Sequence, residues 1–168
     1  MFDHEPHFDN HRLLLSFQDT LGNDLVKDMV SIGGVVDSTT YNTITVYTVN
    51  PEVYKLNVYF PNGITSATRS PTMGLNKNIN YQLEFDVASD KKKHGSSDRK
   101  ITFSLKCPYL FDDDSFHDIV TWWHIGFGNM HNTDATCYRI EYGGKEYTEI
   151  YYVNAFPYNS IATIILDR

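Results

Sequence analysis

Two stretches of the chain alternate apolar and polar residues without interruption, at 81–87 (YQLEFDV) and 101–107 (ITFSLKC). Successive side chains of a β-strand point to opposite faces of a sheet, so each stretch predicts a strand with one buried and one exposed face. Antiparallel sheets accommodate such half-buried strands. The polar segment between them, residues 88–100, contains KKKH and predicts a solvated loop that joins the two strands as a hairpin.

Runs rich in β-branched and aromatic residues predict further strands. These runs are 13–17, 41–49, 54–60, 119–127, 136–142, 145–153 and 161–166. Gly143-Gly144 separates two of them and predicts a tight hairpin, because a type I′ turn needs positive φ at both positions. Direct pairing across this turn would place Glu141 opposite Glu146, a like-charge pair that costs stability.

Long connections separate several of these strands, notably residues 27–40 and 61–80. No segment has the period of a three-turn helix, and only short helical turns are expected, near 112–120. About nine short strands with long crossing connections predict an all-β fold, an antiparallel Greek-key β-sandwich of the immunoglobulin or transthyretin kind. Residues 1–12 show neither period and predict a mobile N-terminal leader, which leaves 13–168 as a single β-sandwich domain.

Composition narrows the classes of partner. The 168 residues fit one domain, which is large enough to fold without a metal or a disulfide. The 12 Tyr and 10 Phe favour strands. The net charge of −7 opposes binding to a phosphate backbone, and the basic residues at 91–94 and 99–100 form only a small loop cluster, so we expect no nucleic-acid partner.

The start of the chain and its apolar runs bear on the compartment. No apolar run reaches the length of a membrane span, and the opening Met-Phe-Asp-His-Glu lacks the basic and apolar segments of a signal peptide. Two interpretations remain: a cytoplasmic protein, or a mature secreted protein that begins with an added Met.

The two cysteines, Cys107 and Cys137, leave a further choice open. A disulfide between them would stabilise the fold by roughly 3–4 kcal/mol on the chain-entropy model. The alternative is two separate buried thiols, since free Cys is commonly buried. Cys107 is in phase with the apolar residues of 101–107 and is predicted to point inward, which argues against a reactive thiol there.

Three consecutive carboxylates open the segment DDDSFHDIVTWWHIG, residues 112–126. An EF-hand loop needs a Gly at its sixth position, where this chain has His117, so that motif is absent. Asp112, Asp113 and Asp114 therefore predict an acidic turn in solvent, with a loose Ca²⁺ site as the weaker alternative.

Three histidines, His117, His124 and His131, recur every seven residues. An odd interval on a strand reverses the face each time, so these side chains are not predicted to chelate one metal together. The leader carries three more histidines, and there we expect no more than transient adsorption of metal.

Aromatic side chains are the candidate ligand contacts. The run 119–127 predicts a strand with Trp123 on one face and Trp122 beside His124 on the other. Such a pair could stack against a carbohydrate if exposed; the competing interpretation is that Trp122 covers a sheet edge or packs under a loop. The candidate ligand-binding residues are Trp122, Trp123, Tyr151, Tyr152 and Tyr158.

Motifs of nucleophilic catalysis and of nucleotide binding are absent from the sequence. There is no Gly-x-Ser-x-Gly elbow, no Walker A loop and no Gly-x-Gly-x-x-Gly. We therefore expect no enzyme and no cofactor. A metal-dependent hydrolase that uses Asp112–Asp114 with His117 or His131 is the least favoured alternative.

Three segments together resemble a group of small secreted lipoproteins of Bacteroidetes gut bacteria, whose function is unknown. They are LLLSFQDTLGNDLV at 13–26, LKCPYLFDDDSFHDIVTWW at 105–123 and CYRIEYGGKEY at 137–147. The resemblance implies export with a lipobox signal and tethering through a lipidated Cys, neither of which this chain carries. Residues 1–12 would then be the tether, and a Cys107–Cys137 bridge would be permissible in that compartment. The family supplies no active-site residues.

The function expected from all of this is a non-enzymatic binding module of the cell envelope, at the outer membrane surface or in the periplasm. Its partner would be a glycan, a peptide or a protein, and it would meet the membrane only through a lipid anchor. A structural or adhesin subunit of the fimbrial type, which pairs an edge strand with a neighbour, is the main alternative.

Overall fold

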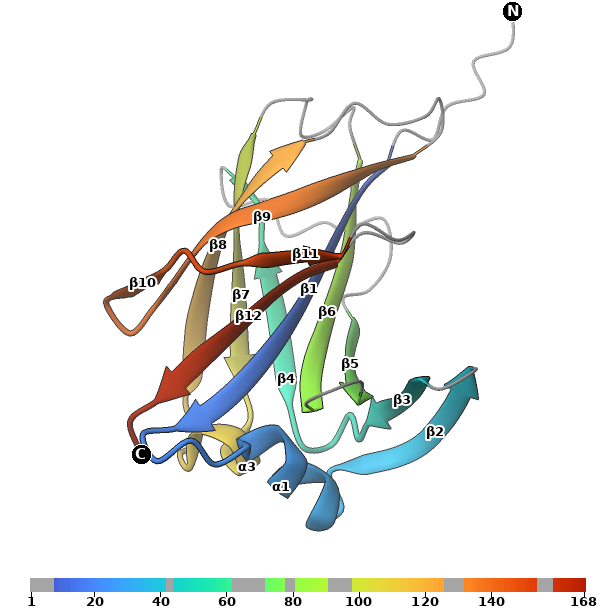
Figure 1. The fold of residues 1–168 in the computed structure, drawn as a ribbon, viewed down its shortest axis with the longest axis vertical. Coiled ribbons are helices and arrows are strands. Elements are labelled where there is room, and N and C mark those ends of the chain that lie inside the picture. Colours follow the sequence, from blue (N-terminus) through green and yellow to red (C-terminus); the bar gives the residue numbers. More distant parts are fainter. Residues whose placement is uncertain are drawn as a thin grey trace, which may run out of the picture.

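The computed structural model describes residues 8–41, 44–61, 72–77, 81–90, 98–125, 132–153 and 159–168. Figure 1 shows their elements. In chain order these are β1 (Phe8–Asp19), α1 (Leu25–Ser31), β2 (Val35–Tyr41), β3 (Ile44–Val49), β4 (Lys55–Tyr59), β5 (Thr72–Lys77), β6 (Tyr81–Asp90), β7 (Arg99–Lys106), α3 (Pro108–Phe111), β8 (Phe116–Ile125), β9 (Asn132–Tyr142), β10 (Lys145–Tyr147), β11 (Tyr151–Val153) and β12 (Asn159–Leu166).

The strands form one twelve-stranded sheet in the order β2-β3-β5-β6-β1-β9-β8-β7-β4, with β10 beside β9, and β12 beside β1 and β11. The predicted all-β fold is confirmed. The sheet is mixed, however, and not purely antiparallel as predicted. One edge of β1 pairs antiparallel with β6, whereas its other edge runs parallel to β9 at Phe8–His11 and to β12 at 13–19.

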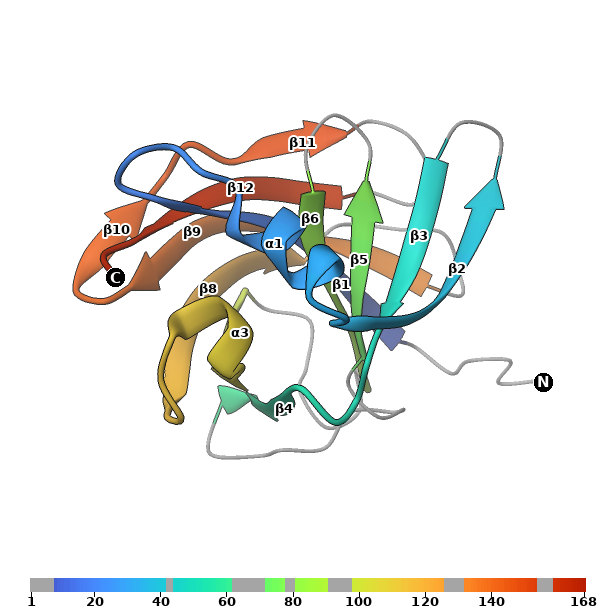
Figure 2. The ribbon, with the colours of Figure 1, turned by 90° about the horizontal axis from the view of Figure 1, so that it is seen from below.

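The sheet curls so that its two halves face one another across the core, with α1 over one end (Figure 2). Phe85 of β6 lies 5.4 Å, ring centroid to centroid, from Phe103 of β7, although three strands separate β6 from β7 in the sheet order. Phe17 of β1 meets Phe111 of α3 at 6.2 Å. These ring contacts are worth about 0.5–1.5 kcal/mol each beyond the area they bury.

The alternation at 81–87 and 101–107 is confirmed. Leu83, Phe85 and Val87 are fully buried, and so are alternate residues of β7. The predicted hairpin between these two strands is wrong, because β6 pairs with β5 and β1, whereas β7 pairs with β4 and β8. Both strands have polar outer faces and apolar inner faces, and that pattern is the same whether the strands are neighbours or lie across a core.

The mobile leader predicted over residues 1–12 is wrong for its last five residues, because β1 already begins at Phe8. Asp9 and His11 are fully buried. The carboxylate of Asp9 accepts a hydrogen bond from the Arg99 guanidinium at 2.9 Å, and His11 packs edge-on against Trp123 with ring centroids 5.0 Å apart. Residues 8–12 are therefore part of the folded domain.

Two segments predicted as connections contain regular structure. Asp24 caps α1 and accepts hydrogen bonds from the backbone N–H groups of Val26 and Lys27 at 3.0 Å. The helix buries Met29 and its own first two residues against the end of the curled sheet. The described part of the second connection, 61–80, contains β5. The expected helical turn lies slightly earlier than predicted, in α3.

The Gly143-Gly144 hairpin is confirmed. Both glycines have positive φ, 58° and 76°, and Glu141 stands opposite Glu146. Arg139 relieves the like-charge pair, because its guanidinium lies 2.8 Å from Glu146 and 3.7 Å from Glu141. Pairing ends at Tyr147, so the strand predicted over 145–153 is divided into β10 and β11.

Candidate functional site

The candidate site lies where β9 leaves β1 and β12 takes its place. The first four residues of β1 pair with β9, and pairing passes to β12 from Leu13 onward. Beyond this point the backbone of Cys137 in β9 has no strand beside it on that edge among the described residues. A buried backbone group without a hydrogen bond costs free energy. Where β9 and β12 separate, the backbone N–H and C=O groups therefore need hydrogen-bond partners other than a neighbouring strand.

Side-chain hydroxyls supply these partners. The Cys137 N–H donates to the Ser160 hydroxyl at 3.0 Å, and the Tyr152 hydroxyl donates to the Cys137 carbonyl at 2.7 Å. Tyr147 acts likewise on β12: the Ile165 N–H donates to its hydroxyl at 3.3 Å, and that hydroxyl donates to the Ile165 carbonyl at 3.4 Å. Three hydroxyl groups thus span the split between β9–β10 and β11–β12.

A groove of about 490 Å³ lies along this split, within the range of ordinary ligand sites. Its lining residues come from β10, the β10–β11 connection, β11 and the outer face of β12: Lys145, Glu146, Tyr147, Thr148, Glu149, Tyr151, Thr163 and Ile165. We call it the β10–β12 groove. It combines two phenol rings with two carboxylates and one ammonium group.

The local backbone explains why the groove is open. Continued antiparallel pairing of β11 with β12 would carry residues 148–150 alongside Ala162 to Ile164, but the chain turns away: the Ile150 N–H donates to the Thr148 carbonyl at 3.0 Å in a three-residue turn. β11 therefore covers only the start of β12. The remaining edge of β12 forms one side of the groove.

Adjacent residues on β11 point to opposite faces, which separates the two predicted tyrosines. Tyr151 pairs with Ile161 and, like Thr163, points into the groove, with 68% of its surface exposed. Tyr152 is on the other face, where it bonds Cys137. Burial, with a smaller effect of Cys137, raises the pKa of the Tyr152 phenol.

The two tryptophans do not form a platform. Trp123 is fully buried, and its indole N–H donates to the Thr121 hydroxyl at 2.6 Å. Trp122 is on the outer face, half-buried, with the Arg139 guanidinium 4.2 Å and the Lys100 ammonium 5.6 Å from its ring centroid. Cation–π contacts of this kind compete with stacking by a sugar. His124 stacks on Tyr138 at 4.0 Å, so the arrangement favours the interpretation in which Trp122 packs against protein groups over a carbohydrate platform.

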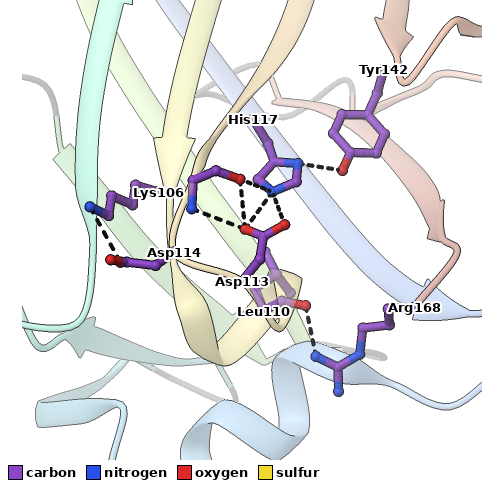
Figure 3. A network of polar contacts seen from close by, with 8 residues as sticks. Lys106, Leu110, Asp113, Asp114, His117, Tyr142 and Arg168 are labelled. Carbon is purple, nitrogen blue, oxygen red and sulfur yellow. Dashed lines mark hydrogen bonds and ion pairs between the residues drawn. The ribbon is translucent and has the colours of Figure 1, made fainter.

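The acidic turn is held by protein contacts (Figure 3). His117 Nε2 is 2.9 Å from the Asp113 carboxylate, and His117 Nδ1 is 3.0 Å from the Tyr142 hydroxyl. Asp114 turns the other way, to Lys106 at 3.3 Å. The hydrogen bond with His117 is the largest cause that lowers the pKa of Asp113, while burial raises the pKa of Tyr142.

These contacts fit the predicted acidic turn, and they do not assemble the weaker alternative, a Ca²⁺ site at Asp112–Asp114. Asp112 ends α3 in the left-handed region with φ 57°, and its two neighbours face different partners. Within the described ranges, no three His, Cys, Asp or Glu side chains are placed to hold a metal ion. His131 and the ligand candidate Tyr158 lie outside the described residues.

The two cysteines are separate buried thiols. Cys137 pairs with Trp123 on β8, whereas Cys107 follows directly on Lys106, which pairs with Phe116 at the other end of that strand. Seven residues of strand span roughly 23 Å, and a disulfide needs Cα atoms within about 7 Å. The disulfide interpretation is wrong for this fold. Burial raises the pKa of Cys107, and it raises that of Cys137 to about 12.

Sequence reasoning identified Tyr151 but missed the rest of the groove. Tyr147, Glu149 and Thr163 become neighbours only because β12 lies beside β1. One local signal was available: the run after Gly143-Gly144 loses its alternation at 148–149, where Thr and Glu follow one another and the strand breaks.

Comparisons with family models, with curated proteins and with solved structures find no match to this chain. None of the helices in the described ranges is long and apolar enough to cross a membrane. The functional argument therefore rests on the geometry of the groove.

Proposed function

We propose that this protein is a non-enzymatic binding module of the cell envelope and that the β10–β12 groove is its ligand site. The observation that carries the proposal is a groove of about 490 Å³ that presents an exposed phenol, Tyr151, beside carboxylate and hydroxyl groups. Binding sites commonly combine an aromatic anchor with a few polar groups that fix orientation. The resemblance to secreted lipoproteins supports the envelope location.

Support also comes from the rigidity of the groove wall. Glu146 is held by Arg139 at 2.8 Å, and Tyr151 lies on β11, whose backbone is paired with β12. A wall whose side chains are already fixed loses little conformational entropy when a ligand binds, which favours affinity.

The test uses an array that carries soluble bacterial and plant polysaccharides on one half and ten-residue peptides on the other. We expect the protein to bind at least one class, and Tyr151→Ala to weaken the retained ligand about 10-fold, because an interface tyrosine commonly contributes 1–2 kcal/mol. Tyr109→Ala is the matched control, since Tyr109 is 41% exposed on α3. Equal binding by wild type and Tyr151→Ala would contradict the proposal, as would the absence of any ligand.

A structural subunit of the fimbrial type is the second candidate. The sheet ends at β2, whose residues 36–40 are all exposed. A register shift between Val35 and Asp37 and the charge of Asp37 interrupt this edge, and natural proteins use both features to prevent edge pairing. The binding module is therefore preferred, and light scattering that shows concentration-dependent assembly would reverse the preference.

The finer fold assignment also stays a prediction. Two facing halves of the sheet support a two-layer arrangement, whereas the parallel pairings of β1 differ from a purely antiparallel immunoglobulin or transthyretin-like sandwich.

A further inference from the structure

We propose that the ligand of the β10–β12 groove is an extended peptide segment that adds as a strand to the open edge of β12. This inference rests on the proposed function and names the chemistry of the ligand. It is carried by the backbone that the groove exposes, in addition to the side chains that line it.

The first step is the direction of the backbone groups of β12. Within a strand, the N–H and C=O of one residue point to the same side, and alternate residues point to opposite sides. Both backbone groups of Ile165 meet the Tyr147 hydroxyl on the groove side. Ile161, four residues earlier, pairs with Tyr151 on that same side. Thr163 lies between them, so its N–H and C=O also point away from β1 and toward the groove.

The second step is what stands beside Thr163. Among the described residues, β12 pairs on this side only through its first three positions, with β11. No described residue hydrogen-bonds the backbone of Thr163 there. The two hydrogen bonds of the Tyr147 hydroxyl to Ile165 are long, 3.3 and 3.4 Å, and they occupy the two groups that a neighbouring strand would use. An incoming strand would replace this phenol with better-placed amide groups.

The third step is size and charge. The open edge, Ala162 to Leu166, would pair with about five residues, a length of roughly 16 Å. Strand addition joins main-chain hydrogen bonds to contacts of alternate side chains. The alternate side chains would meet Tyr151 and the Glu149 carboxylate, on a protein of net charge −7, while Glu146 stays paired with Arg139. A segment with lysines at alternate positions is therefore complementary.

The experiment measures fluorescence anisotropy with a labelled heptapeptide in which lysine alternates with valine or threonine. The same peptide with N-methylated alternate amides keeps its side chains but loses the donors that a strand needs. We expect N-methylation to weaken binding at least 10-fold, the size of two ordinary main-chain hydrogen bonds. Replacing the lysines by glutamates should abolish binding.

A protein variant tests the same hydrogen bond from the other side. Thr163→Pro removes the groove-facing N–H without removing a donor to β1, and proline is tolerated at a sheet edge. It should weaken the peptide about 10-fold, while Thr163→Ala, which keeps the N–H, should change the affinity less than twofold. Circular dichroism of both variants checks folding, and the N-methylated peptide decides the question if Thr163→Pro does not fold.

The outcomes separate this inference from the proposed function. If cellohexaose binds in a Tyr151-dependent way and the peptide does not, the groove is a glycan site and the peptide inference is wrong. Equal affinity of the plain and N-methylated peptides would also overturn it, since side chains alone would then account for binding. If neither probe nor any ligand of the array binds, the proposed function fails as well.

Discussion

The buried ion pair of Asp9 and Arg99 provides the sharpest test of where the folded domain begins. The two charged groups are 2.9 Å apart, with side chains 0% and 2% exposed. Burial lowers the pKa of Arg99, but a guanidinium stays charged at neutral pH. Asp9→Ala would remove this carboxylate from a charge that stays buried.

The expected loss is about 3–5 kcal/mol of unfolding free energy, the usual cost when one partner of a buried pair is removed. For a chain of this size that corresponds to a decrease in Tm of about 6–20 °C. The measurement is urea unfolding followed by tryptophan fluorescence, because Trp123 of β8 is buried next to His11, which lies on β1 two residues from Asp9.

The control is the double variant Asp9→Leu/Arg99→Met, which removes both charges. Replacing a buried pair by apolar residues of similar volume is often close to neutral, so we expect the double variant to recover at least half of the loss. A loss below about 1 kcal/mol in Asp9→Ala would refute the reasoning, and so would a double variant whose loss is the sum of the two single variants.

Three further predictions concern other sites. Tyr152→Phe removes the donor to the Cys137 carbonyl and should lower the free energy of unfolding in urea by about 1 kcal/mol. An unchanged free energy of unfolding would contradict this and would mean that water replaces the phenol. Cys107 and Cys137 should not react with a thiol reagent in the native protein and should yield two thiols after denaturation; a single native thiol that reacts rapidly would contradict their burial. His117→Phe should raise the pKa of Asp113 toward its ordinary value, as measured by carboxyl NMR. Because the folded pKa of Asp113 is depressed, this contact stabilises above the unfolded pKa, near 3.9, and is lost as pH falls through the folded pKa.

Periodicity predicted the strands whose inner face is apolar, and it failed where the inner face is polar. In β1, Asp9 and His11 continue the inward phase of Leu13, Leu15 and Phe17. A pattern rule expects polar residues at these positions to be solvated. They are buried because remote segments supply hydrogen-bond partners, the Arg99 guanidinium for Asp9 and the Val87 carbonyl for His11.

The helix α1 was predictable in principle. Asp24 stands as a cap before Leu25, Val26 and Met29, which have the spacing of one apolar helical face. Seven residues are too few for the period to stand out from a loop, so tertiary packing under the sheet decides that the helix forms.

Strand order and the groove could not be predicted because they depend on pairings between distant segments. Tyr151 was a candidate by residue type alone, whereas its position in a groove depends on the turn at Thr148–Ile150 and on β12 reaching β1. Trp122 has the same residue-type signal, and Arg139 covers it because the register of β8 and β9 brings the two side by side.

The central position of β1 determines when the chain can finish folding. Its Leu13 pairs with Ser160, far along the chain, so β1 lacks one neighbour until β12 has been synthesised. Such remote pairing slows folding, because the entropy of closing the chain is lost before the contact forms. During translation the half-paired strand is an exposed edge, and we expect the nascent chain to depend on chaperones until β12 leaves the ribosome.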